Sequence, residues 1–350
     1  MVKRVVFGIS GDYAQLTGGY AYDRRLIEEF RILGWKADFL DVGSGYPRPE
    51  AATLAFTRQQ LASVPAGTPL LIDGLVYGLM PETAAALQHS HPLIALVHHP
   101  LALETGWSSA DTQRLHISER DALACARAVI ATSMTTARIL IERYGVPRER
   151  ITVALPGTDR CPAAGGSGAE IVSLLSVGAI IPRKGHDRLV AARATLSGLP
   201  WELTIARDPE RNAETLRQLK ADIARFGLSD RILLAGGVSH ERLAALYDRA
   251  DVFVLASHYE GYGMAYTEAL ARCLPVIGTT GGAIPEAVPD GAGLLVPPGD
   301  IPALAAALRR LIASADERRK FSVAAHRAAQ TLPTWSAAAA RVARAIEAVL

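Results

Sequence analysis

The sequence is poor in cysteine, in aromatic residues and in net charge. Its 3 cysteines, Cys125, Cys161 and Cys273, are odd in number and lack metal-ligand spacing, which argues against a disulfide framework and a zinc site. A formal net charge of +2 gives no electrostatic basis for binding nucleic acid. Aromatic residues make up 6% of the chain, so alanine has to supply much of the helix. These scarcities suit a globular protein in a reducing compartment.

Long apolar runs are also missing. No uninterrupted run approaches the roughly 20 residues needed to span a bilayer. The first residues, Met1–Gly8, lack the apolar segment of a signal peptide and are predicted to form a first strand. We therefore expect a cytoplasmic protein, and a peripheral contact with the inner membrane face stays open.

One helical stretch offers charges that could meet anionic lipid. It carries Arg114, Arg120 and Arg127. Glu119 and Asp121 dilute that charge, so an ordinary solvated face is predicted.

The chain does contain enough apolar sequence for two cores. It is 49% hydrophobic and 21% charged, and 350 residues exceed what one core usually serves. Short apolar runs alternate with amphipathic stretches, which is the pattern of a doubly wound α/β sheet. The stretch Pro156–Gly168 has no periodicity and is rich in proline and small residues, so we predict that it links two such series.

The predicted elements follow from apolar periodicity, caps and breakers. Strands are predicted at residues 5–10, 36–42, 70–73, 93–97, 128–132, 151–155, 171–177, 201–206, 232–235, 251–256, 275–278 and 293–296. Helices are predicted at residues 20–33, 81–89, 134–144, 188–196, 216–226, 240–249, 264–272, 301–313 and 336–349. Ser133 and Ser239 are the expected N-caps of two of them.

The most informative stretch is residues 257–271. A buried strand is predicted before it, and a helix begins at Met264. Gly261 and Gly263 allow a sharp turn and leave backbone amides uncovered beside the positive end of that helix. This stretch therefore predicts a site for an anionic ligand at the carboxyl end of a parallel strand.

Two carboxylates bracket this turn. Glu260 precedes the glycines and Glu268 lies one helical turn beyond Met264, so both are expected to face the ligand. A carboxylate can accept hydrogen bonds from two neighbouring hydroxyls, as on a sugar or a ribose. Glutamates on helices are more often simply solvated, so the pair indicates little without its context.

The context is a family resemblance. Glu260 and Glu268 stand in E-G-Y-G-M-A-Y-T-E-A-L-A, which is followed by Leu274-Pro275-Val276 and by G-G-A-I-P-E at residues 281–286. The stretch resembles the donor-site signature of retaining GT-B glycosyltransferases of family 4. The resemblance implies two Rossmann-like doubly wound domains that face a central cleft. Their expected bounds are 1–160 on the acceptor side, 161–168 as linker, 169–333 for the donor, and 334–350 as a helix returning to the first domain.

On the donor side, the resemblance extends to the loop after residue 177. Lys184 and Gly185 match a lysine–glycine pair of the family and Gly178 its first glycine, but Ala179 stands where the family usually has an arginine. Arg183 is hypothesised to supply the missing charge. Gly261, Tyr262, Gly263, Met264 and Glu268 are the remaining predicted donor contacts.

The chain departs from the family pattern at two further places. Residues 207–212 replace a glycine-containing turn that usually lies near the nucleotide base, so the base is not predicted. Cys273 stands where the family often has glycine, and a small buried residue is predicted there.

On the acceptor side, His98 follows a predicted strand and precedes Pro100, so it belongs to the edge where α/β sheets bind ligands. A histidine bonded to a backbone carbonyl is the plain alternative. His98 matches the family's histidine, which is implied to contact the transferred sugar, and His99 is the weaker candidate. Gly18 and Gly19 resemble the glycine pair of the family's first loop, although a simple turn explains them equally well.

The resemblance implies transfer of a hexose from a nucleoside-diphosphate sugar to a hydroxyl of a glycan, lipid or small molecule, with retention of configuration. Lys184, Arg183 and the amides of the turn would stabilise the diphosphate, Glu260 would bind sugar hydroxyls, and Glu268 the ribose. No aspartate pair suited to a divalent cation is evident, so no metal cofactor is expected. Alternatives are a sugar phosphorylase, a sugar-nucleotide epimerase and a non-catalytic sugar-nucleotide-binding protein. A nicotinamide-dependent dehydrogenase is disfavoured because no G-x-G-x-x-G follows the first strand.

Overall fold

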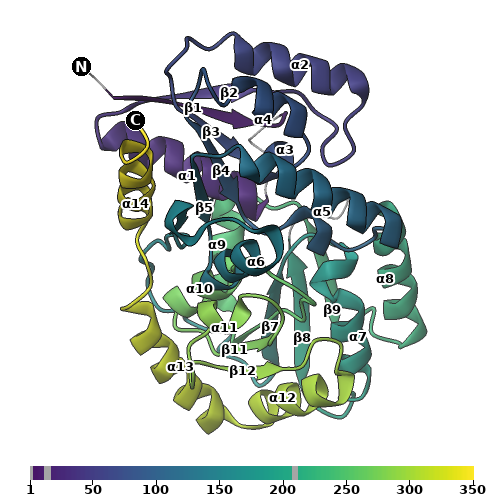
Figure 1. The fold of residues 1–350 in the computed structure, drawn as a ribbon. Coiled ribbons are helices and arrows are strands. Elements are labelled where there is room, and N and C mark those ends of the chain that lie inside the picture. Colours follow the sequence, from purple (N-terminus) through teal and green to yellow (C-terminus); the bar gives the residue numbers. More distant parts are fainter. Residues whose placement is uncertain (1–2, 12–16, 207–211) are drawn as a thin grey trace. The chain divides into compact units, whose positions relative to one another are not determined.

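The computed structural model describes residues 3–11, 17–206 and 212–350. The chain divides into two compact units (Figure 1). Unit 1 comprises Met1–Gly157 and Pro333–Leu350, and unit 2 comprises Thr158–Leu332. These divisions lie within a few residues of the expected bounds at 160 and 334. Residues 207–211, in the loop that replaces the family's glycine-containing turn, fall outside the described part of the chain.

Within the described residues, unit 1 has a six-stranded parallel sheet in the order β2-β1-β3-β4-β5-β6. The order reverses between β1 and β3, so the loops after these two strands diverge and leave room for a ligand at their carboxyl ends. The strands are β1 (Arg4–Ile9), β2 (Lys36–Asp41), β3 (Leu70–Asp73), β4 (Leu93–Val97), β5 (Ala128–Ala131) and β6 (Ile151–Val153).

Helices cover both faces of this sheet, because its strands are apolar on both sides. On one face the core joins strand residues such as Ile72 to side chains including Tyr77 and Leu140. On the other, Phe7 meets Phe30 of α1 edge to face, and α14 packs beside α1 (Figure 1). The helical segments are α1 (Gly18–Ile32), α2 (Ala51–Ala62), α3 (Gly74–Tyr77), α4 (Pro81–Leu87), η1 (Leu101–Leu103), α5 (Ser109–Ala124), α6 (Met134–Tyr144), η2 (Arg148–Arg150) and α14 (Trp335–Glu347).

Within the described residues of unit 2, the six-stranded parallel sheet has the order β12-β11-β10-β7-β8-β9. Numbered from β7, this is the 3-2-1-4-5-6 order of dinucleotide-binding folds, with its reversal between β7 and β10. The strands are β7 (Val172–Val177), β8 (Trp201–Ala206), β9 (Ile232–Gly236), β10 (Val252–Val254), β11 (Val276–Thr279) and β12 (Gly293–Val296).

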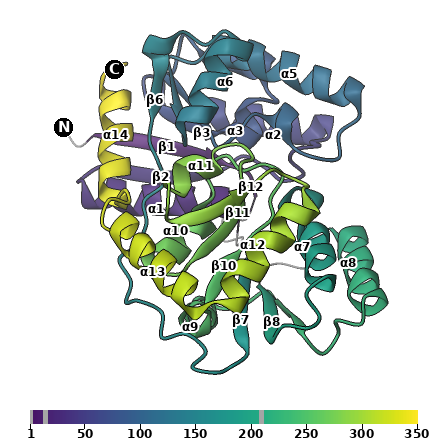
Figure 2. The same cartoon turned by 90° about the horizontal axis from the view of Figure 1, so that it is seen from below.

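Two helical layers bury this second sheet as well. One core joins alternate strand residues such as Leu174 and Val254 to Leu189 of α7 and Leu308 of α12, and these two helices lie side by side (Figure 2). On the opposite face, Phe253 lies between the rings of Tyr247 and Tyr266. The helical segments are η3 (Pro182–Lys184), α7 (His186–Ala194), α8 (Ala213–Arg225), α9 (His240–Arg249), α10 (Met264–Ala271), α11 (Ile284–Ala287), α12 (Ile301–Ala313) and α13 (Ala315–Ala329).

The predicted linker has no helix or strand over residues 154–171, as its composition indicates. It is nevertheless tied to unit 2 by its backbone. The N–H groups of Gly165 and Ser167 donate to the carboxylates of Asp248 and Asp251, and that of Ala164 donates to the Arg272 carbonyl. Residues 164–167 are therefore anchored to unit 2 by their backbone.

Most predicted elements match the structure to within two or three residues, and Ser133 and Ser239 cap α6 and α9 as predicted. The prediction omitted α2, α13 and the four-residue helices α3 and α11, and it gave α5 only as a helical stretch without bounds. Among the described residues no helix is long and apolar enough to cross a membrane.

Candidate functional site

The switch point of unit 2 brings together the loops after β7 and β10. The loop after β7 contains Gly178 and η3, which carries Arg183 and Lys184, and the loop after β10 carries Ser257 and Glu260. Because neighbouring parallel strands end at the same edge, residues far apart in sequence meet here. The predicted cations and the first predicted carboxylate therefore share one cluster, which we call the Glu260 cluster: Arg183, Lys184, Ser257 and Glu260.

One glycine allows these loops to approach one another. Gly185 has a φ of 64°, and a Cβ there would collide with the carbonyl oxygen of Ala256. A Cβ on Gly178 would lie 3.4 Å from the aliphatic stem of Lys184, which is an ordinary contact. The lysine–glycine pair thus lets the η3 turn lie directly on the end of β10, and this contact aims Lys184 at Glu260.

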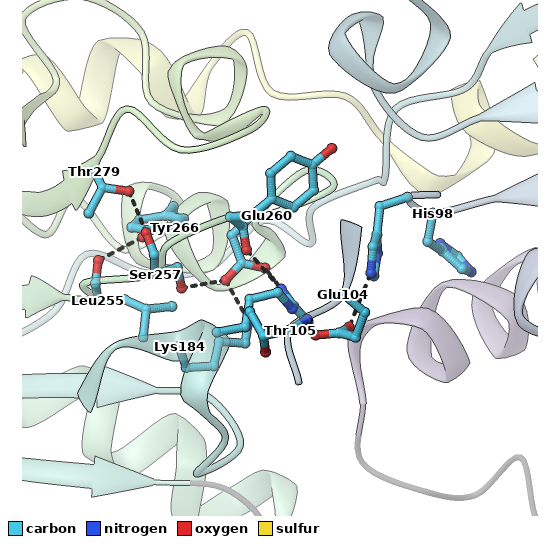
Figure 3. A network of polar contacts seen from close by, with 12 residues as sticks. His98, Glu104, Thr105, Lys184, Leu255, Ser257, Glu260, Tyr266 and Thr279 are labelled. Carbon is cyan, nitrogen blue, oxygen red and sulfur yellow. Dashed lines mark hydrogen bonds and ion pairs between the residues drawn. The ribbon is translucent and has the colours of Figure 1, made fainter. Parts of the chain in front are cut away.

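Glu260 is the centre of the cluster (Figure 3). Its Oε1 accepts hydrogen bonds from Lys184 Nζ and from Ser257 Oγ, both at 2.6 Å. Its Oε2 accepts from Arg183 Nη1 at 3.1 Å, and the same nitrogen donates to the Tyr259 carbonyl. The Arg183 side chain is 11% exposed, so it is turned inward and not toward solvent. The hypothesis that Arg183 supplies a charge at this edge is consistent with that position.

The charges of the cluster set the ionisation of Glu260. Burial by itself would raise its pKa, but Lys184, Arg183 and the hydroxyl of Ser257 outweigh burial and lower the pKa to about 2. Glu260 is therefore a carboxylate at neutral pH. Within the Glu260 cluster itself, two cations face one carboxylate, so the cluster has a net positive charge that favours an anion nearby.

The backbone on either side of Glu260 is held as firmly as its side chain. Its carbonyl accepts the N–H of Ala283, and a Cβ on Gly282 would collide with that carbonyl. Gly263, at a φ of 101°, precedes α10, and a Cβ there would press on the ring of Tyr266. The turn over residues 261–263 thus begins a helix of eight residues whose first amides can face an anion.

The second predicted carboxylate lies farther along α10. Glu268 is partly buried, and its Oε2 accepts a hydrogen bond from the Tyr247 hydroxyl of α9 at 2.9 Å. The guanidinium of Arg272 lies 4.6 Å from the centre of the Tyr247 ring. Glu268 is therefore positioned by α9 and is not a member of the Glu260 cluster.

The switch point of unit 1 holds a second, more acidic cluster. His98 follows β4, and its Nε2 lies 3.4 Å from Asp23 Oδ1 of α1 and 3.7 Å from Asp73 Oδ2 at the end of β3. We call Asp23, Asp73 and His98 the His98 cluster. Burial and the neighbouring Asp23 raise the pKa of Asp73 to about 8, although His98 acts in the opposite direction.

This cluster corrects the statement that the chain lacks an aspartate pair suited to a cation. Among the described residues, Asp23, Asp73 and His98 form a group whose ligand atoms lie within 4.8 Å of one another. The sequence analysis missed both acids. Asp73 ends a strand, as a ligand-binding residue should, and Asp23 is a charge on the buried stripe of α1 that also contains Leu26, Ile27 and Phe30. A charge on an apolar stripe was the available signal.

The glycine pair Gly18-Gly19 is not in a loop, because it forms the first turn of α1 behind the N-cap Thr17. A Cβ on Gly19 would lie 3.3 Å from the His98 ring, so the absence of a side chain lets α1 rest against that histidine. His99 pairs with Glu104 at 3.2 Å and takes no part in the His98 cluster.

The structure also contradicts the predicted burial of two side chains, Glu119 and Cys273. Glu119 does not belong to a solvated face: it is 1% exposed and accepts the N–H of Leu101 at 2.9 Å, and burial raises its pKa to about 8. Cys273 is only partly buried. Its φ of 59° is in the left-handed region, which explains why a glycine suits this position, and its Sγ lies 3.4 Å from Nδ1 of His326.

Comparisons with known proteins match both units of the chain. Residues 168–328 match the family model described as glycosyl transferases group 1, and residues 75–160 match the model described as glycosyltransferase family 4. The two matches fall in unit 2 and mainly in unit 1 respectively. The first contains the Glu260 cluster, and the second contains His98.

Curated relatives extend the match. The chain is 31% identical over 270 residues to the MMP alpha-(1->4)-mannosyltransferase of Mycolicibacterium hassiacum, covering 71% of this chain and 64% of the relative. It is 32% identical over 280 residues to the D-inositol 3-phosphate glycosyltransferase of Kineococcus radiotolerans, covering 72% of this chain and 64% of the relative. The matches thus span somewhat under two thirds of these relatives' own length.

Solved structures share the fold along almost the whole chain. Sucrose-phosphate synthase of Thermosynechococcus elongatus superposes with a TM-score of 0.81 at 23% identity, covering 97% of this chain and 98% of that one. The Anabaena protein HepE, solved with UDP-glucose, superposes with a TM-score of 0.76 at 16% identity, covering 98% and 99%. Taken with the two family matches, these likenesses mean that the chain belongs to glycosyltransferase family 4 and has the GT-B fold.

Proposed function

We propose that this protein transfers a hexose from a nucleoside-diphosphate sugar to an acceptor hydroxyl and retains the anomeric configuration. One observation carries the proposal: a buried carboxylate, Glu260, is clamped by Lys184 and Arg183 at the switch point of unit 2. This part of the chain lies inside the match to glycosyl transferases group 1.

The chemistry of the transfer explains why such a cluster is useful. Cleavage of the anomeric bond leaves a diphosphate and a sugar with oxocarbenium character, so the main task is electrostatic. The ammonium of Lys184, the guanidinium of Arg183 and the amides that begin α10 would stabilise the departing diphosphate. Removing one preorganised donor of this kind typically costs about 10²–10³-fold in kcat.

The role proposed for Glu260 is to hold sugar hydroxyls. A carboxylate has about four acceptor positions, and the three side-chain hydrogen bonds on Glu260 leave acceptor capacity. Its pKa of about 2 also makes it a weak base and a weak nucleophile. These properties favour a route in which the donor's own phosphate accepts the proton of the acceptor on the same face, without a covalent sugar–Glu260 intermediate.

The other predicted residues complete the proposal. Glu268 would hold the ribose diol, in an orientation maintained by the hydroxyl of Tyr247. His98 would contact the sugar from unit 1. The clamp of Lys184 and Arg183 already provides two fixed positive charges, so we expect transfer to proceed without an added divalent cation.

The decisive experiment measures products from a panel of uridine, guanosine and adenosine diphosphate hexoses, with and without acceptors. Because the relatives' names include mannosyl- and inositol-phosphate glycosyltransferases, the acceptors should include phosphorylated polyols and sugars. We expect a free nucleoside diphosphate and an α-linked product from an α-linked donor, with EDTA having no effect. A β-linked product would refute retention.

The same assay separates the alternatives. A phosphorylase would form a sugar 1-phosphate from inorganic phosphate and a glycoside. An epimerase would change the sugar and release no nucleoside diphosphate. A binding protein would raise its thermal midpoint with one donor and turn over none of the acceptors. Any of these results would contradict the proposed transfer.

A further inference from the structure

One imidazole nitrogen of His98, Nε2, is buried in unit 1 without a hydrogen bond of normal geometry among the described residues. Nε2 faces Asp23 Oδ1 at 3.4 Å and Asp73 Oδ2 at 3.7 Å. The ring is held from two other sides by Gly19 and by the edge of Tyr22, whose centroid lies 5.4 Å away. The His98 carbonyl accepts the hydroxyl of Thr132. The ring orientation is therefore set by α1, β3 and β4 together.

The two aspartates differ in how they are satisfied. Asp73 Oδ1 accepts the N–H of Leu75 at 2.6 Å and caps α3. Asp23 is 0% exposed, and both of its carboxylate oxygens are without a hydrogen-bond partner among the described residues. A buried carboxylate without a partner is costly. Two polar hydrogens can reach it, one on His98 Nε2 and the carboxyl proton of Asp73, whose pKa is raised to about 8.

We propose that Asp23, assisted by Asp73, is a positioning residue that keeps a proton on Nε2 of His98 and so leaves Nδ1 as the nitrogen offered to the sugar. The contact between Nδ1 and the sugar rests on the proposed function. The position of the proton on Nε2 does not depend on it. A carboxylate that receives an imidazole N–H fixes both the tautomer and the ring orientation, as in hydrolytic triads. The rest of the ring can then meet a ligand at the carboxyl edge of the sheet.

The charges around His98 support this assignment. Although burial lowers the pKa of His98, Asp23 and Asp73 outweigh it and raise the pKa above its ordinary value. Among the residues that the structure describes, the titratable groups that face the ring are Asp23 and Tyr22 from α1 and Asp73 from β3. Burial raises the pKa of Tyr22, so it is neutral. Below the pKa of His98, Nδ1–H donates a hydrogen bond, and above it Nδ1 accepts one from a sugar hydroxyl.

A divalent cation is the competing occupant of the same atoms. Asp23, Asp73 and His98 offer ligand atoms within 4.8 Å of one another, and imidazole with carboxylates suits zinc or manganese. A metal would take the lone pair of Nε2 and displace its proton. A proton and a metal ion therefore cannot occupy Nε2 at the same time. The 15N NMR signal of this nitrogen distinguishes the two states.

The test is 15N NMR of the imidazole nitrogens in histidine-labelled protein, as a function of pH and without substrate. The signals of His98 are assigned by their loss in His98→Gln. The Asp23→Asn variant removes the charge and keeps the shape, and Asp38→Asn, at a partly exposed ion pair with Arg4, is the matched control. Zn²⁺ and Mn²⁺ are then added separately to metal-free protein.

We expect the wild type to hold its proton on Nε2 in the neutral state. In Asp23→Asn the pKa of His98 should fall by about one unit, a tenfold loss of proton affinity, whereas Asp38→Asn leaves it unchanged. An Nδ1–H tautomer in the wild type, an unshifted pKa in Asp23→Asn, or stoichiometric Zn²⁺ or Mn²⁺ binding on Nε2 would overturn the proposal.

Kinetics adds a readout that depends on the proposed function. In Asp23→Asn, the limb of the kcat–pH profile that reports His98 should move to lower pH by the same unit, with little change in the KM for the donor. A limb that stays in place while the NMR pKa moves would show that Nδ1 does not meet the sugar. If no transfer is found with any donor, the NMR result still decides the placement of the proton.

Discussion

The two units use buried carboxylates in opposite ways at equivalent places. In unit 2, one carboxylate meets two cations and a hydroxyl, and its pKa falls to about 2. In unit 1, two carboxylates meet one histidine, and the pKa of Asp73 rises to about 8. Both clusters lie where the strand order reverses, so the fold positions the site while the side chains decide its charge. The first suits an anion, and the second suits protons and hydroxyls.

Removing a cation from unit 2 should have the largest effect. Lys184→Met leaves Glu260 buried with fewer partners, so we expect a loss of roughly 3 kcal/mol in the free energy of unfolding. Urea denaturation of unit 2 measures it. The double variant Lys184→Met/Glu260→Gln should recover part of that loss because the buried charge is gone. A double variant no more stable than Lys184→Met would show that the pair is not coupled.

Neutralising the carboxylate should mainly affect turnover. Glu260→Gln is expected to lower kcat by about 10²-fold while the Kd for the nucleoside diphosphate stays nearly constant, because the proposed contacts of Glu260 are to the sugar. Steady-state kinetics and calorimetric titration provide the two numbers. If the Kd worsened more than kcat, Glu260 would be a nucleotide ligand and the proposed roles would be exchanged.

The contrast between the clusters predicts opposite dependences of stability on pH. The lowered pKa of Glu260 stabilises the fold above about pH 4.5, and this contribution is lost as the pH falls from 4.5 toward 2. The raised pKa of Asp73 has the opposite effect on the free energy of unfolding. This free energy declines as the pH rises from about 3.8 toward 8, because only the unfolded chain then ionises this group. Denaturation curves across this range measure both.

Matched variants assign each limb of that stability curve. Asp73→Asn imitates the protonated acid and should reduce the decline between pH 4 and 8, and Glu119, whose pKa is also raised to about 8, accounts for a remaining part. Glu260→Gln should flatten only the acidic limb. An unchanged decline in Asp73→Asn would mean that the aspartate is already ionised in the folded protein, and the contrast between the two units would disappear.

The smallest effect is expected at Glu268. Glu268→Ala should weaken binding of the nucleoside diphosphate by about tenfold, the value of one charge-assisted hydrogen-bond pair, with little change in kcat for bound donor. Tyr247→Phe removes only the hydroxyl that orients Glu268 and should cost less. Equal losses from the two variants would indicate that Glu268 acts only through its contact with Tyr247.

Several members of the two clusters could be located from the sequence because their signals are local. Lys184, Gly185, Glu260 and His98 each follow a strand, and the glycines beside them show where backbones must approach closely. Asp23 could not be found in this way, because its partner His98 comes from another strand and only the sheet order brings them together. Glu119 was assigned to solvent for the same reason, since η1 covers it from elsewhere in the chain.

The amino-acid sequence by itself determined the alternation of strands and helices, the two sheets, and the family, because periodicity, caps and turn glycines act over a few residues. Tertiary structure alone decided the charge state of each site. Glu260 meets Arg183 and Lys184 from 77 and 76 residues away, and burial makes every such neighbour count far more than it would in water.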